Sequence, residues 1–203
     1  MNLQNSFFYF TEAIPRRICD DIIKYGELKD KLLGVTGDMP DREMSNKEKN
    51  KLFKTRNSSV VFLDDPWIYS LIIPYINRAN DLSGWKFQID TPETTQWTKY
   101  SKTQHYTWHM DSFPNPYQNN EFHGKIRKLS MTLSLCDGDE YEGGDLEFDL
   151  RDKPTKSTIL TSKDARKKGT ITVFPSFVYH RVTPVTKGTR YSLVSWILGN
   201  PFI

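Results

Sequence analysis

The feature that most constrains the fold is a succession of short β-rich runs in the chain after Gly84. Each run is rich in β-branched and aromatic residues, which favour strands. Glycine-containing turns separate the runs, for example at Asp137-Gly138-Asp139, Gly143-Gly144 and Lys187-Gly188. The expected strands are Trp85–Ile89, Thr94–Tyr100, Tyr106–Met110, Arg127–Cys136, Asp145–Leu150, Gly169–Phe174, Val178–Val185 and Thr189–Leu198. About eight short strands with such turns predict a double-sheet jelly roll, the double-stranded β-helix.

The N-terminal part of the chain follows a different pattern, which predicts helices and one strand. Apolar residues recur at helical spacing over residues 15–33, where Pro15 suits the first turn and Gly34 suits a stop. A strand is expected at Ser58–Leu63, and a second helix at Pro66–Asn80. Helices that precede a run of strands indicate an α+β protein.

The domain organisation follows from these two patterns. Residues 35–55 are polar and have little periodicity, so we expect a long loop with a short helix near Lys47–Phe53, which in an enzyme can act as a lid. We expect one α+β domain over residues 1–203. In it, a helical support at about residues 1–83 packs on one sheet of a jelly-roll core at about residues 84–203.

Composition excludes several functional classes. The net charge of +3 is too small to require a nucleic-acid partner. No apolar run approaches the roughly 18–20 residues that a membrane-spanning helix needs, and the N-terminus lacks the pattern of a secretory signal peptide. Only two cysteines occur, which are too few for a disulfide-stapled scaffold. We therefore expect a cytoplasmic protein that contacts neither a membrane nor nucleic acid.

Lysine and arginine gather in three places, at Lys47–Arg56, Lys125–Lys128 and Lys163–Lys168. Such clusters are typical of solvated loops. They also fit a basic rim that steers an acidic substrate toward a site. The sequence leaves both interpretations open.

His109-Met110-Asp111 is the central motif. In an extended strand, side chains two positions apart project from the same face, so His109 and Asp111 can direct an imidazole and a carboxylate at one point. With His180 from a later strand, the set matches the two-histidine, one-carboxylate triad that holds Fe(II) in non-haem oxygenases. The His-x-Asp pattern alone also fits a strand-end histidine that is hydrogen-bonded to the neighbouring aspartate.

A basic residue follows the third candidate ligand in a position suited to an anchor. Arg190 comes ten residues after His180, across the turn at Lys187-Gly188. A hairpin there would return Arg190 to the strand adjoining His180, where its guanidinium could bind a dicarboxylate bidentately. Ser192 projects from the same face and can add a hydroxyl donor. The apolar and aromatic residues around Arg190 argue against a surface arginine beside a turn.

These motifs together resemble the 2-oxoglutarate/Fe(II) dioxygenase superfamily, and within it the prolyl 4-hydroxylase-like and PKHD-type hydroxylases. The resemblance covers roughly residues 84–199. The matching stretches are Gln96–Tyr100, Tyr106–Asp111, Leu129–Leu135, Gly143–Phe148, Gly169–Ser176 and His180–Trp196. The resemblance implies the jelly-roll fold that the strand pattern predicts.

The resemblance implies a role for each residue of the motifs. His109, Asp111 and His180 match the iron ligands, and Arg190 matches the basic residue that pairs with the distal carboxylate of 2-oxoglutarate. There is one departure, because oxygen-sensing relatives have a tyrosine that bonds this carboxylate where the present chain has Ser134. The iron site is unaffected by this difference.

The remaining pocket positions rest on the resemblance in the same way. Tyr100 matches a tyrosine near 2-oxoglutarate and the substrate, Tyr106 a second pocket tyrosine, and Trp196 a pocket tryptophan. These aromatic residues also fit the core of a β-sandwich. Ser192 or an ordered water is the candidate for the missing donor to the distal carboxylate.

The implied activity is the hydroxylation of a C–H bond with Fe(II), 2-oxoglutarate and O₂, with release of succinate and CO₂ and with ascorbate as a candidate addition. A prolyl residue in a peptide or protein is the first candidate substrate, and a free amino acid or other small molecule is the second. Two other classes stay open: a non-catalytic sensor module that binds metal and 2-oxoglutarate, and a cupin-like zinc protein that does not depend on 2-oxoglutarate.

Overall fold

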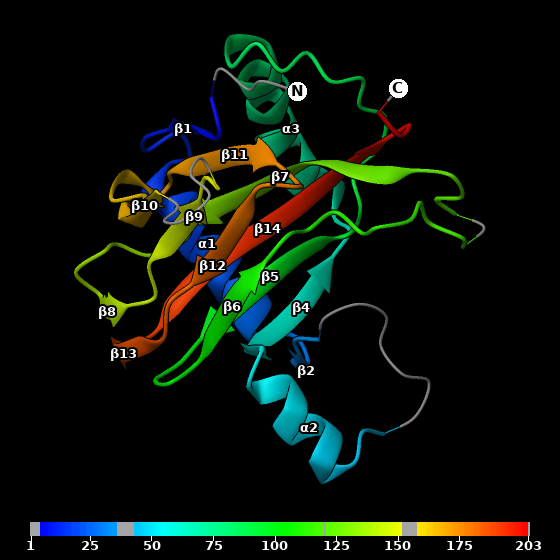
Figure 1. Cartoon of the computed structure of the whole chain (residues 1–203). Coiled ribbons are helices and arrows are strands. Elements are labelled where there is room, and N and C mark those ends of the chain that lie inside the picture. The colour runs from blue at the N-terminus through cyan, green and yellow to red at the C-terminus, as the bar shows by residue number, and fades with distance from the viewer. Residues whose placement is uncertain (1–4, 36–42, 120, 152–157, 203) are drawn as a thin grey trace.

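The computed structural model describes residues 5–35, 43–119, 121–151 and 158–202, and it contains two antiparallel sheets flanked by helices (Figure 1). The larger sheet consists, in order, of β1 (Phe8–Phe10), β11 (Ile171–Pro175), β7 (Ile126–Ser134), β14 (Arg190–Gly199), β5 (Thr95–Tyr100), β4 (Ser59–Leu63) and β2 (Leu32–Leu33). The smaller sheet consists of β10 (Ile159–Thr161), β9 (Leu146–Asp149), β12 (Tyr179–Val182), β6 (His105–His109) and β3 (Arg56–Asn57). A separate ribbon pairs β13 (Val185–Gly188) with β8 (Tyr141–Gly143). The predicted α+β class and jelly-roll architecture are confirmed.

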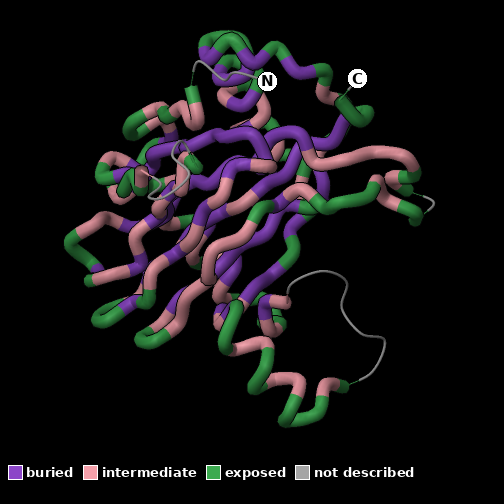
Figure 2. The backbone as a smooth tube through the Cα atoms, viewed as in Figure 1, coloured by how far each residue is buried: buried purple, intermediate pink, exposed green. Residues whose placement is uncertain are grey.

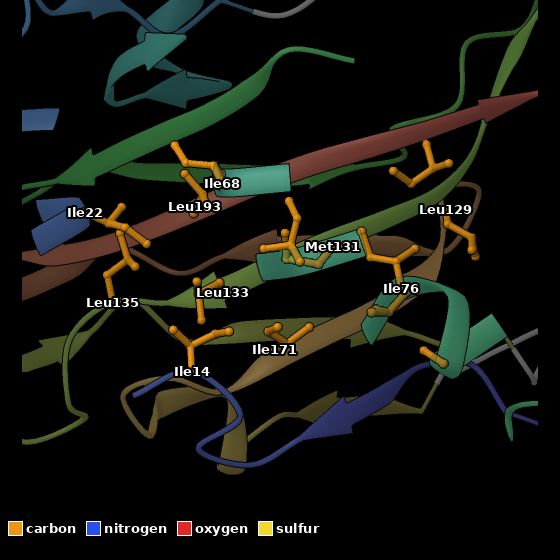
Figure 3. Packing of buried hydrophobic residues seen from close by; sticks show 14 of the residues in the cluster. Ile14, Ile22, Ile68, Ile76, Leu129, Met131, Leu133, Leu135, Ile171 and Leu193 are labelled. Atoms are coloured by element: carbon orange, nitrogen blue, oxygen red, sulfur yellow. The ribbon is translucent and has the colours of Figure 1, made fainter. Parts of the chain in front are cut away.

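The helices are α1 (Arg16–Glu27), α2 (Asn46–Phe53), α3 (Pro66–Leu82) and the short 3₁₀ helix η1 (Asp164–Arg166). α3 turns Ile68, Ile72 and Ile76 to one side, because residues four apart share a helix face. These fully buried side chains pack with Leu133 of β7 and Leu193 of β14, and α1 joins the same core (Figure 3). Figure 2 shows the buried residues along the strands and the exposed residues at the turns and on α2. α1 and α3 therefore cover one face of the larger sheet, as predicted.

Three local predictions are confirmed. The strand expected at Ser58–Leu63 is β4, and the helix expected at Pro66–Asn80 is α3 with two further residues. The short helix near Lys47–Phe53 is α2, and it begins with a capping box in which the Ser45 hydroxyl accepts from the Glu48 amide. The rest of the expected loop includes residues 36–42, which lie outside the described residues.

The first helix is shorter than predicted. It ends at Glu27 instead of residue 33, and Leu32–Leu33 pair with β4 as strand β2. The apolar spacing continues past Glu27, but Leu28 is 86% exposed and is therefore not packed against the core. A periodic pattern extends a helix only where the packing partner also continues.

The strand predicted at Trp85–Ile89 is absent, and this segment is an irregular connection. The Asn80 carboxamide accepts from the Phe87 amide and donates to the Phe87 carbonyl, at 3.0 and 2.9 Å. Lys86 has a positive φ of 51° and donates to the Asn80 carbonyl. The Asn80 side chain of α3 therefore satisfies the Phe87 backbone groups, which a neighbouring strand would otherwise pair. Among the described residues, no helix has the length and apolar character needed to cross a bilayer.

Glu27, the last residue of α1, connects that helix to the larger sheet. Its Oε1 accepts from Lys99 Nζ at 2.7 Å and from the Tyr191 hydroxyl at 2.9 Å, and its Oε2 lies 2.9 Å from Lys31 Nζ. Burial by itself would raise the pKa of Glu27, but the bonds from Lys99, Lys31 and Tyr191 outweigh burial and lower the pKa to about 2.

Replacing Glu27 with glutamine should reduce the free energy of unfolding at pH 7 by about 1 kcal/mol, because one partly exposed charged cluster is lost. The pKa of Glu27 is lowered in the folded state. The wild type is therefore more stable than the glutamine variant by the full amount above the ordinary carboxyl pKa of 4.5, and this difference in stability is lost as the pH falls toward about 2. Urea unfolding at pH 7 and at pH 3 measures both effects. Asp30→Asn, which removes an exposed carboxylate, is the control. If wild type and Glu27→Gln differ in free energy of unfolding by as much at pH 3 as at pH 7, this role of Glu27 is contradicted.

Candidate metal centre and its pocket

The pairing of β12 with β6 brings two histidines together. His180 lies directly opposite His109 in the register of these strands, and the two ring centroids are 4.1 Å apart. Asp111 follows β6, and its amide donates to the carbonyl of Ser176 at 2.9 Å, which fixes the chain as it leaves the strand. One ligand atom from each of His109, Asp111 and His180 lies within 4.8 Å of the others, so the predicted triad is assembled.

Hydrogen bonds to the backbone fix how both histidines present their rings. His109 Nδ1 lies 2.8 Å from the Thr107 carbonyl, and His180 Nδ1 lies 3.0 Å from the Val178 carbonyl. Because a carbonyl can only accept, each Nδ1 is a donor, which leaves Nε2 as the ring nitrogen that can bind a metal. The two Nε2 atoms lie 3.6 and 3.5 Å from the oxygens of Asp111. Such backbone bonds are the usual support of a histidine that binds metal.

The electrostatics of the triad favour a neutral His180 and an ionised Asp111, which are the states that bind a metal. Burial and the neighbouring His109 lower the pKa of His180 to about 4, so its ring is neutral near pH 7. Burial by itself would raise the pKa of Asp111, but His180 and His109 outweigh it and hold that pKa below the usual range. Two imidazoles and one carboxylate fit Fe(II), since this donor set leaves further coordination positions open.

Two buried serines support the Asp111 carboxylate. The Ser130 hydroxyl donates to Asp111 Oδ2 at 2.7 Å, and the Ser130 and Ser176 hydroxyls are 2.9 Å apart. Both serines are almost fully buried. Because the strand alternates its side chains, Leu129 and Met131 enter the core while Ser130 faces the triad. The serines orient the carboxylate without binding the metal themselves.

The triad lies in a cavity of about 600 Å³ between the two sheets, a size typical of small-molecule sites. The smaller sheet contributes the histidines, and the larger sheet contributes Arg190, Ser192 and Trp196. Arg190 is 4% exposed and donates to the Ser192 hydroxyl at 3.1 Å. A buried guanidinium therefore faces the same cavity as the candidate metal ligands.

The predicted hairpin between His180 and Arg190 is wrong. The expected strand Val178–Val185 is divided into β12 and β13, and β13 pairs with β8 instead of returning along β12. At Gly188 the φ is 71° and a Cβ would come within 2.2 Å of a backbone oxygen, so only glycine fits the turn. The chain then enters the larger sheet as β14. Arg190 is thus across the cavity from His180 and not on the adjoining strand.

The other residues predicted for the pocket also line this cavity. The ring of Tyr106 stacks on that of His109, with centroids 3.5 Å apart. Tyr100 is buried, and the Arg190 guanidinium carbon lies 5.5 Å from the centre of the Tyr100 ring. Arg127 lies 4.1 Å above the Trp196 ring. Their chemical roles stay predictions.

The residue that departs from the family pattern does not reach the cavity. Ser134 is buried, and its hydroxyl donates to the Cys136 carbonyl at 3.0 Å. Ser192 is already bonded to Arg190, which supports its expected place beside the anchor. Tyr141 is a further neighbour of Arg190 that the sequence did not reveal. Burial raises the pKa of Tyr141, and the nearby Arg190 opposes this rise.

Sequence reasoning also missed an ion pair in the cavity wall. Arg127 pairs with Glu93 through two contacts, at 2.7 and 2.5 Å, and the Tyr117 hydroxyl donates to Glu93 at 2.8 Å. Arg127 belongs to the basic cluster Lys125–Lys128, but nothing in the sequence pattern links it to Glu93, which is 34 residues away. Arg56, at the end of another basic cluster, is also buried in the wall.

A family model described as the 2OG-Fe(II) oxygenase superfamily matches residues 95–198, about half of the chain. The match runs from β5 to β14 and includes the triad and Arg190. A PKHD-type hydroxylase of Synechococcus sp. (strain CC9605) is 38% identical over 100 residues, which are 49% of this chain and 39% of that relative. The matched region thus spans well under half of the relative's length.

Two solved structures are similar over nearly the whole chain. The viral collagen prolyl hydroxylase from Paramecium Bursaria Chlorella virus-1 has a TM-score of 0.63 and 17% sequence identity, over 96% of this chain and 97% of its own. A prolyl hydroxylase from Trichoplax adhaerens, in complex with a hypoxia inducible factor oxygen degradation domain peptide fragment, has a TM-score of 0.67 and 16% identity, over 95% of this chain and 83% of its own. At these identities the likeness shows the fold.

Replacing Asp111 with alanine should weaken Fe(II) binding by more than the roughly 10–100-fold that loss of an outer partner costs, because the only carboxylate of the triad is removed. Anaerobic calorimetry with Fe(II) measures the affinity. Far-ultraviolet circular dichroism shows whether the variant stays folded. A folded variant with wild-type iron affinity would exclude this triad as the metal site.

Replacing Ser130 with alanine should weaken Fe(II) binding by about 10-fold, since the Asp111 carboxylate loses the donor that orients it. Ser195→Ala is the matched control, because Ser195 is equally buried and its hydroxyl has no partner among the described residues. Equal iron affinities in the two variants would show that Ser130 does not support the carboxylate.

Proposed function

The chain belongs to the 2OG-Fe(II) oxygenase superfamily, and we propose that it is an Fe(II)- and 2-oxoglutarate-dependent dioxygenase that hydroxylates a C–H bond. The observation that carries this proposal is the shared cavity. It has the triad His109, Asp111 and His180 on one wall and the buried Arg190 on the other. A metal site and a dicarboxylate anchor facing one space are the two parts that this chemistry requires.

In this proposal His109 Nε2, His180 Nε2 and one Asp111 oxygen hold the iron. Bound Fe(II) would supply the redox chemistry by which O₂ converts 2-oxoglutarate to succinate and CO₂ and hydroxylates the substrate. The protein's own contribution is position. The backbone bonds of both histidines and the Ser130 hydroxyl hold the three donors in place before any ligand arrives.

Arg190 is proposed to bind the distal carboxylate of 2-oxoglutarate. Its guanidinium is buried, and the neighbours described here, Ser192, Tyr100 and Tyr141, are neutral. The charge of Arg190 is therefore available to a dianion, and its planar shape suits two parallel hydrogen bonds to a carboxylate. Burial excludes water and strengthens that pair.

The substrate is proposed to be a prolyl residue in a peptide or protein. Supporting this, both similar structures described above are prolyl hydroxylases, and one of them holds a peptide. Three side chains that line the cavity, Phe62, Met110 and Phe113, are also 41–48% exposed, so they form an apolar mouth that an extended peptide can contact. A free amino acid or other small molecule remains the second candidate. The cytoplasmic location and the use of ascorbate stay predictions.

The decisive assay measures succinate formed from 2-oxoglutarate with Fe(II) and O₂, with and without proline-containing peptides. The proposal expects succinate in the wild type, a faster rate with an accepted peptide, and a mass increase of one oxygen atom in that peptide. Folded wild-type protein that binds Fe(II) and 2-oxoglutarate but forms no succinate under any of these conditions would favour the non-catalytic module.

Replacing Arg190 with alanine should raise the KM for 2-oxoglutarate by roughly 10–100-fold, the amount expected from losing a charged, buried hydrogen-bonded pair. Arg190→Lys should restore part of the affinity, because it keeps the charge but loses the bidentate geometry. The Fe(II) affinity measured without 2-oxoglutarate should stay unchanged in both variants. An unaltered 2-oxoglutarate requirement in Arg190→Ala would remove the proposed anchor.

A further inference from the structure

A second buried arginine lines the cavity, on the opposite wall from Arg190. Arg56 lies in β3, at the edge of the smaller sheet, and is 5% exposed. It pairs in register with Tyr106 of β6, and its guanidinium carbon lies 4.8 Å from the centre of the Tyr106 ring. Because Tyr106 in turn stacks on His109, Arg56 is one aromatic ring away from a candidate metal ligand.

The surroundings of Arg56 hold its guanidinium in one orientation. Its Nε donates to the Ser58 hydroxyl at 3.0 Å, and one terminal nitrogen donates to the Val35 carbonyl at 2.8 Å. A Cβ at Gly34 would come within 2.7 Å of the Arg56 Nε and 2.3 Å of the Ser58 oxygen. The glycine therefore leaves the space that this side chain fills. A buried arginine with such support is positioned in advance for a ligand.

No carboxylate pairs with Arg56 among the residues that the structure describes. Its two hydrogen-bond acceptors there, a hydroxyl and a carbonyl, are neutral, and its ring contact is to a phenol. Arg56 differs in this respect from Arg127, which is neutralised by Glu93. Burying a cation without a counter-charge is costly unless a ligand supplies one.

The charge balance of the loaded cavity indicates what that ligand is. Arg127 and Glu93 cancel, and Asp111 with bound 2-oxoglutarate offsets the charges of Fe(II) and Arg190. Imidazoles that bind a metal are neutral ligands, so among the described residues that line the cavity the charge left over is the positive charge of Arg56. The lysine-rich α2 ends only three residues before Arg56. Its lysines add to the positive electrostatic potential near Arg56.

We propose that Arg56 is a specificity-determining residue that binds a carboxylate of the substrate, so that the hydroxylated compound is anionic close to the reacting carbon. This inference rests on the proposed function, because it assigns the substrate of that same site. The carboxylate has two possible sources. It is either the main-chain carboxylate of a free amino acid or the side chain of an acidic residue beside the target residue in a peptide.

The first test uses protein loaded anaerobically with Fe(II) and saturating 2-oxoglutarate, and titrates propionate and propionamide by calorimetry. The two probes have nearly the same shape and differ in charge. Wild type should bind propionate at least about 10-fold more tightly than propionamide, and Arg56→Gln should lose this preference. Arg56→Lys should keep part of it. Arg78→Gln, which removes an exposed arginine of α3, should behave as wild type.

Equal binding of the acid and the amide to the wild type, no binding of propionate, or a preference that survives in Arg56→Gln would overturn the role of Arg56. The loading step separates this result from a failure of the proposed function. If 2-oxoglutarate does not bind to the Fe(II)-loaded protein, the dioxygenase proposal and the Arg56 inference both fail. If it binds normally and the probes do not discriminate, only the Arg56 inference fails.

A second pair of titrations on the same loaded protein distinguishes the two sources. L-proline is compared with L-prolinamide, and an N-acetylated Pro-Asp amide with its Pro-Asn counterpart. A preference for L-proline that depends on Arg56 identifies the amino acid's own carboxylate. A preference for the Pro-Asp peptide identifies an acidic neighbour. If neither pair discriminates, Arg56 does not select the substrate by its carboxylate.

Discussion

The site depends on the antiparallel pairing of β6 with β12. This register places His180 opposite His109, and the same strand geometry turns Asp111 to the point between them. A shift of one residue in either strand would turn one imidazole to the other face of the sheet. The carbonyls of Thr107 in β6 and of Val178, just before β12, then accept from the two Nδ1 atoms, so the local backbone orients both imidazole rings.

The larger sheet makes this centre into a pocket. Its outer face packs on α1 and α3, and its inner face presents Arg190 across the cavity from the triad. The chain passes between the two sheets at Gly188, so the ten residues from His180 to Arg190 connect opposite walls. Arg56 and the Arg127–Glu93 ion pair are the other charged groups among the described residues that line the cavity. Among the described residues no carboxylate pairs with Arg56 or Arg190, and we propose that each arginine binds an anionic group.

The predictions from sequence succeeded where a periodic pattern or a spaced motif determines the structure, and they failed where a tertiary contact does. The pattern of short strands predicted the jelly roll. The His-x-Asp motif, the spacing from His180 to Arg190 and the family resemblance together predicted the triad. α1 ends where its next apolar residue, Leu28, is no longer buried, and the irregular segment after α3 is held by the Asn80 side chain. The path to Arg190 depends on β8, a three-residue strand with no periodicity of its own. An ion pair between residues far apart in the chain, such as Arg127 and Glu93, produces no local sequence pattern that would predict it.

The central claim is that one cavity holds iron and 2-oxoglutarate together. Crystals grown anaerobically with Fe(II) and 2-oxoglutarate, measured at the iron absorption edge, test it most directly. We expect one anomalous-difference peak from iron between His109, Asp111 and His180, with the dicarboxylate extending from that peak to Arg190. An iron peak elsewhere in the molecule, or a dicarboxylate that does not contact Arg190, would contradict it.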